Sequence, residues 1–156
     1  IATSNSNAIR PYAAEIIQRQ LLDAGVKVTL RVMEWQAFLN TVVSPRKFDS
    51  VLLGWSLSLS PDPYALWHSD SDVPGGFNLV GYHSASTDKL IERMENSTDP
   101  ERIASLQRQI FARIVGDNPY LFLVIPNEIN VYNRRISGVK PTINGIWENY
   151  IDWEKK

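Results

Sequence analysis

Two histidines, His68 and His83, are the side chains best suited to acid–base or metal chemistry in this chain of 156 residues. Neither stands in a metal-binding spacing such as HExxH, and no GxSxG, GxxxxGK[ST] or GxGxxG motif occurs. The sequence contains no cysteine, which excludes thiol catalysis and cysteine-ligated zinc. Most carboxylates are explained as helix caps, such as Asp62 and Asp99, or as solvated surface. We therefore expect no enzyme, no catalytic residue, no metal site and no cofactor.

Aromatic residues offer a different chemistry, non-covalent ligand binding, in the stretch LLGWSLSLSPDPYALWHS at 52–69. Trp55 follows an apolar run, and the alternating serines and leucines after it cannot continue as a regular strand into Pro61. Their backbone groups need hydrogen-bond partners, and a ligand is one candidate beside water and local turns. The predicted ligand-binding residues are Trp55, Ser56, Leu57, Ser58, Leu59, Trp67 and Asn78.

Several of these residues have a structural alternative. Trp55 could be a core tryptophan, and Asn78, which follows a Gly-Gly loop, could bond its own backbone instead of a ligand. Trp35 fits the apolar stripe of a helix, so we expect it in the core. We expect His68 to be a structural hydrogen-bonding residue.

Composition and charge narrow the class of protein. With 44% hydrophobic and 21% charged residues, the chain is typical of one globular domain with its own core. The net charge of -1 provides no global field for nucleic acid or anionic membranes, so we expect no nucleic-acid partner. The chain begins at Ile1 without an initiator methionine, which suggests a processed chain or an excised segment.

The first half of the chain predicts a βαβ unit. Residues 7–24 form an apolar stripe at helical spacing, with Asn7 as a cap and Gly25 as the stop. Residues 27–33 alternate as a strand, 34–44 return to a helix that ends at Pro45, and 48–55 form a buried strand. Because only residues 1–3 remain for a strand before the first helix, the chain looks as if it begins in mid-fold.

The second half is predicted to be mostly helical, with strands near its end. Asp62-Pro63 begins a short helix, Ser86 or Thr87 caps a second over 86–97, and Asp99 caps a third that ends near Gly116. The run YLFLVIP at 120–126 predicts a buried strand, and residues 129–133 and 138–139 predict edge strands. Helices that alternate with strands indicate an α/β fold, a mixed sheet flanked by helices.

Four segments together carry a family resemblance. They are AAEIIQRQLLDAGVKVTLRVMEWQAFLNTV, FDSVLLGWSLSLSPDPYALWHS, FNLVGYHSASTDKLIERM and ERIASLQRQIFARIVGDNPYLFLVIPNEINVYNRRISGV. In this order they resemble the C-terminal lobe of the family 5 extracellular solute-binding proteins, the peptide- and nickel-type binding subunits of bacterial ABC importers. The resemblance covers nearly the whole chain. It implies a type II periplasmic-binding-protein-like lobe with a βαβ unit and C-terminal strands.

The resemblance also implies how such a lobe works. Family members close two lobes around a small-molecule or peptide ligand and deliver it to permease subunits of the transporter in the membrane. Residues 1–156 would be a single domain, the second lobe, with 129–156 near the hinge or the first lobe. The whole protein would be secreted or lipid-anchored, in the periplasm or on the extracellular face of the cytoplasmic membrane.

One departure from the family pattern concerns the ligand. In peptide binders of this family, an aspartate three or four residues after the tryptophan of the GW pair holds the ligand ammonium group. Counting from Trp55 gives Ser58, and counting back from Pro63 gives Leu59, and neither is acidic. Either the other lobe supplies the acid, or the ligand is not a simple peptide with a free amine. The alternatives are an aromatic-platform glycan-binding module, or a hydrolase in which His68 or His83 bonds a carboxylate in a cleft.

Overall fold

The computed structural model describes residues 1–56, 62–127, 129–142 and 145–156. The chain divides into two units, which are described separately below. The first unit comprises residues 1–56 and 62–119, and the second comprises the described residues from Tyr120 to Lys156. Predicted site residues Leu57, Ser58 and Leu59 lie outside the described residues.

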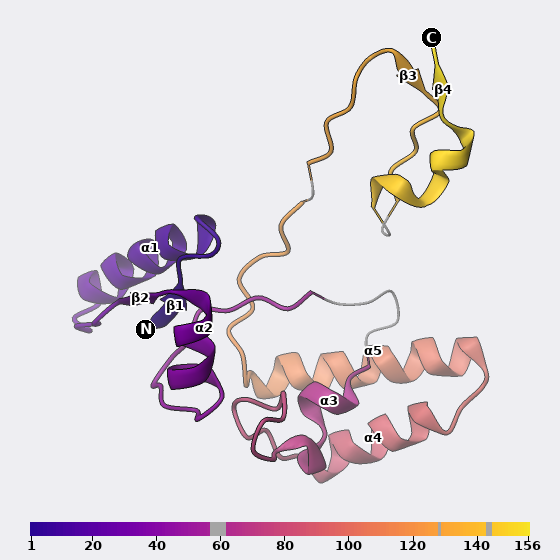
Figure 1. Ribbon diagram of the computed structural model, residues 1–156. Helices are drawn as coiled ribbons and strands as arrows, with labels where there is room; N and C mark the ends of the chain where they lie inside the picture. The colour runs from indigo at the N-terminus through magenta and orange to yellow at the C-terminus, as the bar shows by residue number, and fades with distance from the viewer. Residues whose placement is uncertain (57–61, 128, 143–144) are drawn as a thin grey trace. The chain divides into compact units, whose positions relative to one another are not determined.

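A short parallel sheet organises the first unit (Figure 1). Strand β1 (Ala2–Ser4) pairs in parallel with β2 (Arg31–Met33), and Ala2 also forms a parallel bridge with Val51. Residues 2–4 therefore do form a strand that precedes the first helix, and this strand lies between β2 and Val51. The predicted strand at 27–33 is shorter than predicted, and the predicted strand at 48–55 is reduced to an isolated bridge at Val51.

Helix α1 (Ile9–Asp23) connects β1 to β2 and completes the βαβ unit. The Ile9 backbone N–H donates to Asn7 Oδ1 at 2.9 Å, which starts the helix, and Gly25 follows its end with a φ of 85°. After β2, Glu34 caps α2 (Trp35–Phe38), and the chain continues as a π-helical turn over Leu39–Val43. The predicted helices at 7–24 and 34–44 are thus confirmed.

One hydrophobic core combines side chains from β1, from α2 and the π-helical turn after it, and from the loop at residue 79. The buried side chains are Ala2, Phe38, Val42, Val43 and Leu79, with Met33, Trp35, Leu39, Phe48, Val51 and Leu53 packed against them. Trp35 is half-buried in this cluster, as its helical stripe predicted. Leu79 packs in the same cluster as Ala2 of β1, so the loop after residue 73 contributes to the core beside the sheet.

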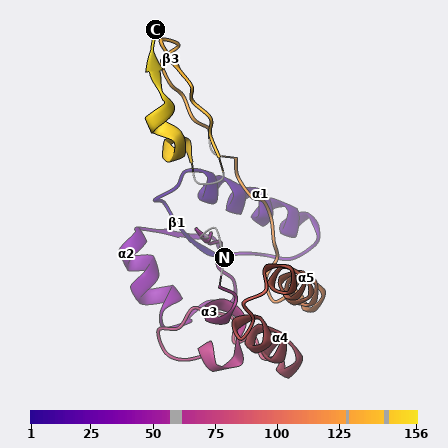
Figure 2. The same ribbon diagram turned by 90° about the vertical axis from the view of Figure 1, so that its right-hand side faces the viewer.

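The rest of the first unit is helical. Short helix α3 (Tyr64–Trp67) precedes α4 (Ala85–Glu95) and α5 (Pro100–Asp117), and the last two lie side by side in Figures 1 and 2. Asp62 and Asp99 accept hydrogen bonds from the backbone N–H groups of Tyr64 and Glu101, which confirms both predicted caps. The residue that caps α4 is Ser84, so the predicted cap at Ser86 or Thr87 was placed two or three residues too late.

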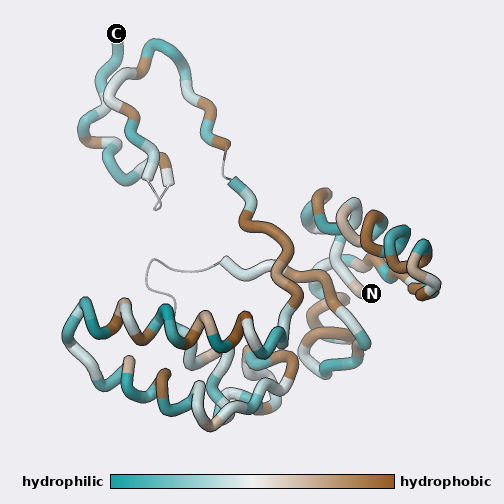
Figure 3. The backbone as a smooth tube through the Cα atoms, turned by 180° about the vertical axis from the view of Figure 1, so that it is seen from behind, coloured by the Kyte–Doolittle hydropathy of each residue, from teal (hydrophilic) through white to brown (hydrophobic). Residues whose placement is uncertain are grey.

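The second unit corrects the prediction for residues 120–126. This run forms no strand, and the apolar side chains of 121–125 are exposed, from 45% for Leu123 to 97% for Ile125. Figure 3 shows the run as one continuous apolar stretch of the tube. The predicted edge strand at 129–133 is also absent, and the one near 138–139 falls at β3 (Ile136–Ser137), which pairs antiparallel with β4 (Glu154–Lys155). A 3-10 helix over Ile146–Asp152 precedes β4.

Candidate ligand-binding edge

Parallel strands end together at one edge of a sheet, and in open α/β sheets ligands bind at this carboxyl edge. Here β1 ends at Ser4, β2 ends at Met33, and the segment that bridges to β1 at Val51 runs on to Trp55. We call the residues that follow these two strands and the bridging segment the carboxyl edge. It consists of 5–10, 34–35 and 54–56, together with Phe77, which contacts Trp55.

Trp55 presents an aromatic face at the carboxyl edge. Its side chain is 37% exposed and meets the ring of Phe77 edge to face, with the ring centroids 5.7 Å apart. Phe77 is itself 56% exposed. The neighbouring Ser56 is also exposed. The structure therefore brings two predicted residues, Trp55 and Ser56, to the expected edge, and it adds Phe77, which the sequence did not single out.

Arg10 is a second residue that the sequence analysis missed. The loop after β1 places it in the first turn of α1, where its guanidinium carbon lies 5.8 Å from the centre of the Trp35 ring. The same guanidinium lies beside Gly54, where an added methyl group would be 3.4 Å from Arg10 Nη2. A basic residue in the first helical turn after a strand is the signal that could have found it, because that turn faces the carboxyl edge.

Trp67 and Asn78, by contrast, are buried. Trp67 is 4% exposed and packs edge to face on Tyr82, with a centroid distance of 5.9 Å. Asn78 is fully buried, and its Nδ2 donates to the backbone oxygens of His68 and Tyr82 at 3.3 and 2.8 Å. Its Oδ1 accepts from the Tyr82 backbone N–H at 2.8 Å. These contacts favour the alternative interpretation of Asn78 as a residue that bonds loop backbone.

His68 occupies a structural position, as predicted. Its ring stacks on Tyr64 with centroids 4.1 Å apart, and its Nδ1 accepts a hydrogen bond from the Asp70 backbone N–H at 3.1 Å. An accepting Nδ1 fixes the neutral tautomer that carries its proton on Nε2. That Nε2 is buried without a hydrogen bond and lies 3.6 Å from Glu92 Oε1.

His83 makes the contact with a carboxylate that the hydrolase alternative requires. Its Nε2 lies 2.7 Å from Asp72 Oδ2, and the other oxygen of Asp72 pairs with Arg46. The Arg46 guanidinium, and after it the His83 imidazole, hold the pKa of the Asp72 carboxyl below its usual range. Within the described residues no hydroxyl is hydrogen-bonded to His83, whose side chain is 59% exposed. The group is therefore best explained as an ion-pair cluster that joins three loops.

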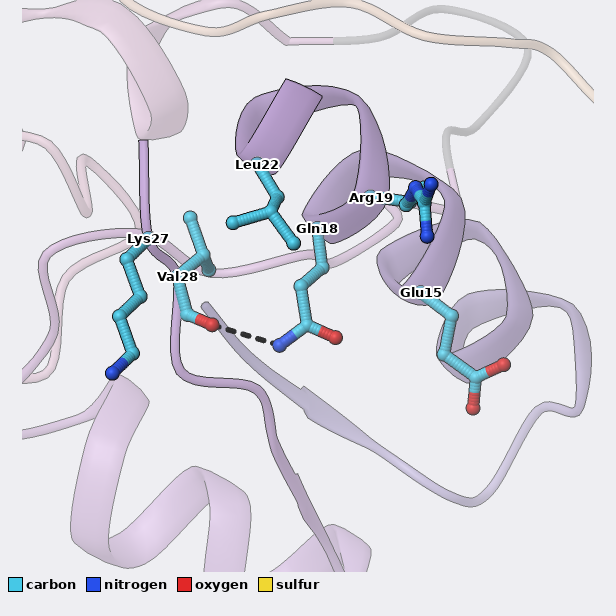
Figure 4. A pocket seen from close by; sticks show the side chains of 6 residues that line it. All are labelled: Glu15, Gln18, Arg19, Leu22, Lys27 and Val28. Atoms are coloured by element: carbon cyan, nitrogen blue, oxygen red, sulfur yellow. Dashed lines mark hydrogen bonds between the residues drawn. The ribbon is translucent and has the colours of Figure 1, made fainter. Parts of the chain in front are cut away.

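Two surface hollows share no lining residue with the carboxyl edge. One, of about 290 Å³, is lined by residues 44–46 and 72–74 beside the Arg46–Asp72 pair. The other, of about 380 Å³, is lined by α1 and residues 27–28 (Figure 4). There, Gln18 Nε2 donates to the Val28 backbone oxygen at 2.7 Å. This hydrogen bond connects α1 with the segment that leads to β2.

The hollow in Figure 4 begins at Glu15 and reaches past the carboxyl end of α1. Arg10 stands in the first turn of this helix of 15 residues, which spans roughly 20 Å. The hollow therefore lies toward the amino ends of the parallel strands, opposite the carboxyl edge. Among the described residues no group of three potential metal ligands is found, and none of the described helices is long and apolar enough to cross a membrane.

Comparison with known proteins gives one family. Residues 1–77 match the bacterial extracellular solute-binding proteins, family 5 Middle. The chain is 33% identical over 141 residues to the oligopeptide-binding protein AppA of Bacillus subtilis (strain 168), which covers 90% of this chain and 26% of the relative. It is 26% identical to the di/tripeptide-binding protein 4 of Pseudomonas aeruginosa (strain UCBPP-PA14), over 81% of this chain and 24% of the relative.

Solved structures agree with the sequence matches. AppA from Bacillus subtilis in complex with a nonapeptide superimposes with a TM-score of 0.78 at 30% identity, over 99% of this chain and 31% of that one. NikZ from Campylobacter jejuni in complex with Ni(L-His) matches with a TM-score of 0.67 at 21% identity, over 99% of this chain and 32% of that one, and supports the fold alone. The α/β, type II binding-protein fold is therefore confirmed. The chain spans about a quarter to a third of the length of these relatives.

Proposed function

Because the chain belongs to the bacterial extracellular solute-binding proteins of family 5, we propose that it is one ligand-binding lobe of such a protein. The lobe binds an oligopeptide or a related small solute outside the cytoplasm, on the periplasmic or extracellular side of the membrane. It performs no chemistry. The ligand stabilises a closed form of two lobes, and permease subunits of an ABC importer recognise that form.

The observation that carries this proposal is the exposed aromatic pair of Trp55 and Phe77 at the carboxyl edge. In open α/β sheets ligands bind at the carboxyl edge, and two exposed aromatic rings in contact there offer a ligand an apolar surface. Trp55 and Ser56 are the predicted site residues that lie there, and we assign ligand contact to them. Trp67 and Asn78 support the loop behind the edge, since both are buried.

We also propose that residues 1–119 form the second lobe proper and that the chain from Tyr120 onward packs against the remainder of the full-length protein. Support comes from the exposure of the apolar run 121–125, which finds no cover in its own unit. Residues 129–156 would then lie near the hinge. The unit boundary at Tyr120 falls nine residues before the hinge segment expected from the sequence at Ile129.

A thermal-shift screen of the full-length protein tests the ligand class. The panel holds peptides with free and blocked N-termini, oligosaccharides and nickel chelates. A ligand that binds the folded state raises the melting temperature by mass action. We expect stabilisation by peptides. Stabilisation by oligosaccharides alone would overturn the peptide proposal and favour the glycan-binding alternative, for which no relative named above gives support.

A matched pair of variants tests the site. Trp55→Ala should weaken peptide binding by at least about tenfold, since buried aromatic anchors dominate binding energies. Phe111→Ala on α5 is the control, because Phe111 is 38% exposed, close to the 37% of Trp55, but lies outside the carboxyl edge. Calorimetry gives both affinities. An unchanged affinity for Trp55→Ala would remove Trp55 from the ligand site.

A further inference from the structure

Arg10 is a half-buried cation at the carboxyl edge that the fold itself does not neutralise. No carboxylate of the described residues lies within the 4.0 Å of an ion pair, and no described side chain accepts a hydrogen bond from its guanidinium. Glu34, the residue before its partner Trp35 in the sequence, caps α2 and accepts from the Ala37 backbone N–H at 3.0 Å. The charge of Arg10 is therefore available to a ligand.

The position of this guanidinium is fixed on two sides. The Trp35 ring attracts it across 5.8 Å as a cation–π contact, and Trp35 is held in turn by the core cluster. Gly54 lies on its other side, where an added methyl group would be 3.4 Å from Arg10 Nη2, in van der Waals contact with it. Neither contact consumes an N–H donor, so all five remain for hydrogen bonds.

Two of the described segments beside Arg10 carry no negative charge. Residues 54–56 include no charged side chain, and the first turn of α1 contains no acidic residue. The positive end of the helix dipole adds to the charge of Arg10 in that turn. A guanidinium in such a setting matches a carboxylate best, because its planar fork can bind both oxygens in parallel.

We propose that Arg10 anchors a carboxylate of the ligand at the carboxyl edge, next to the aromatic pair of Trp55 and Phe77. This inference rests on the proposed function and deepens it, because it assigns the ligand an anionic group on this lobe. The carboxylate is either the C-terminus of a peptide or an acidic side chain within it. Trp35 and Gly54 act as positioning residues that hold the guanidinium in place.

The test uses the full-length protein and three matched peptides, namely one with a free C-terminal carboxylate, its C-terminal amide, and the amide with one internal glutamate. Calorimetry measures each affinity for the wild type and for Arg10→Gln. We expect the wild type to prefer one carboxylate form over the plain amide by about ten- to a hundredfold. Arg10→Gln should abolish this preference and lower the affinity for the plain amide by much less than the affinity for the preferred carboxylate form. The preferred form identifies the source of the carboxylate.

Two further variants test whether the loss of carboxylate preference is specific to the Arg10 guanidinium. Arg19→Gln lies on the same helix, where Arg19 pairs with Asp23 in solvent, and it should retain the wild-type preference. Arg10→Lys keeps the charge but loses the planar fork, so it should retain part of the preference. Equal binding of all three peptides by the wild type, or equal losses in Arg10→Gln and Arg19→Gln, would overturn the role of Arg10 and leave the proposed function standing. Absence of any peptide binding by the wild type would overturn both.

Discussion

Replacing Asn78 with alanine separates a structural role of this residue from a ligand-binding one. The side chain makes three hydrogen bonds, to the backbone oxygens of His68 and Tyr82 and to the Tyr82 N–H, and it is fully buried. Each bond contributes about 1 kcal/mol net, so the loss is about 3 kcal/mol. That is a large part of the roughly 5–15 kcal/mol by which a domain is stable.

Thermal unfolding of the full-length protein, followed by circular dichroism, measures this loss. In a protein as long as these relatives, which are three to four times the length of this chain, about 3 kcal/mol lowers the melting temperature by roughly 2–3 °C. Asn78→Asp keeps the acceptor for the Tyr82 N–H but turns an oxygen toward two carbonyls, so it should destabilise the protein at least as much. A variant Asn78→Ala that melts like the wild type but binds peptide more weakly would refute the structural role and place Asn78 in the ligand site.

Three further predictions concern other parts of the chain. The pKa of Asp72 is lowered in the fold by Arg46 and His83, so its contribution to stability is present above about pH 4 and is lost as the pH falls through the lower folded value. Asp72→Asn should therefore lower the melting temperature at neutral pH and flatten its fall in acid, and an unchanged profile would contradict the ion pair. Asn118, which ends α5 with a φ of 50°, should tolerate glycine, whereas Asn118→Val should cost about 1–2 kcal/mol in urea unfolding. In hydrogen exchange, the amides of 121–125 should be unprotected in this chain alone and protected in the full-length protein; equal exchange would show that nothing covers them.

Elements whose signals are local could be predicted from the sequence. Helix α5 shows this, because the Asp99-Pro100 start and the apolar stripe are signals of the helix's own residues, and its predicted end near Gly116 falls one residue from the observed end at Asp117. The strands could not be bounded in the same way, since a strand ends where its partner ends. The apolar pattern predicts a strand over all of residues 48–55. In the structure this segment bridges to β1 only at Val51, because β1 is three residues long.

The residues of the candidate site also divide into those that a local sequence signal identifies and those that only the fold brings together. Trp55 could be placed at the carboxyl edge from its position after an apolar run. Phe77 and Arg10 could not be joined to it, because they come from a loop and a helix that meet Trp55 and Gly54 only in the fold. The sequence allowed both a ligand-binding and a structural role for Asn78. Its burial, and the hydrogen bonds of both its polar groups to backbone, arise only when the loop packs.

The apolar run 121–125 shows what hydrophobic pattern can and cannot specify. The pattern predicts that these side chains are buried, but it does not say against which chain. In the structure they are exposed, so the cover that the pattern requires must come from outside the second unit. We expect that cover in the remainder of the full-length protein, since the chain spans about a quarter to a third of the length of its relatives.

Two separate regions lead to the same conclusion about the ligand. The sequence of 54–60 offers no acid for a ligand ammonium group, and the structure offers an unneutralised guanidinium at Arg10. A buried ammonium without a countercharge costs several kcal/mol, roughly, whereas a carboxylate beside Arg10 would satisfy both charges. Under the proposed function, this lobe is therefore suited to the anionic end of a ligand. If the ligand is a peptide with a free amine, the acid that neutralises the amine must come from the other lobe, and blocking the amine should then weaken binding equally in the wild type and in Arg10→Gln.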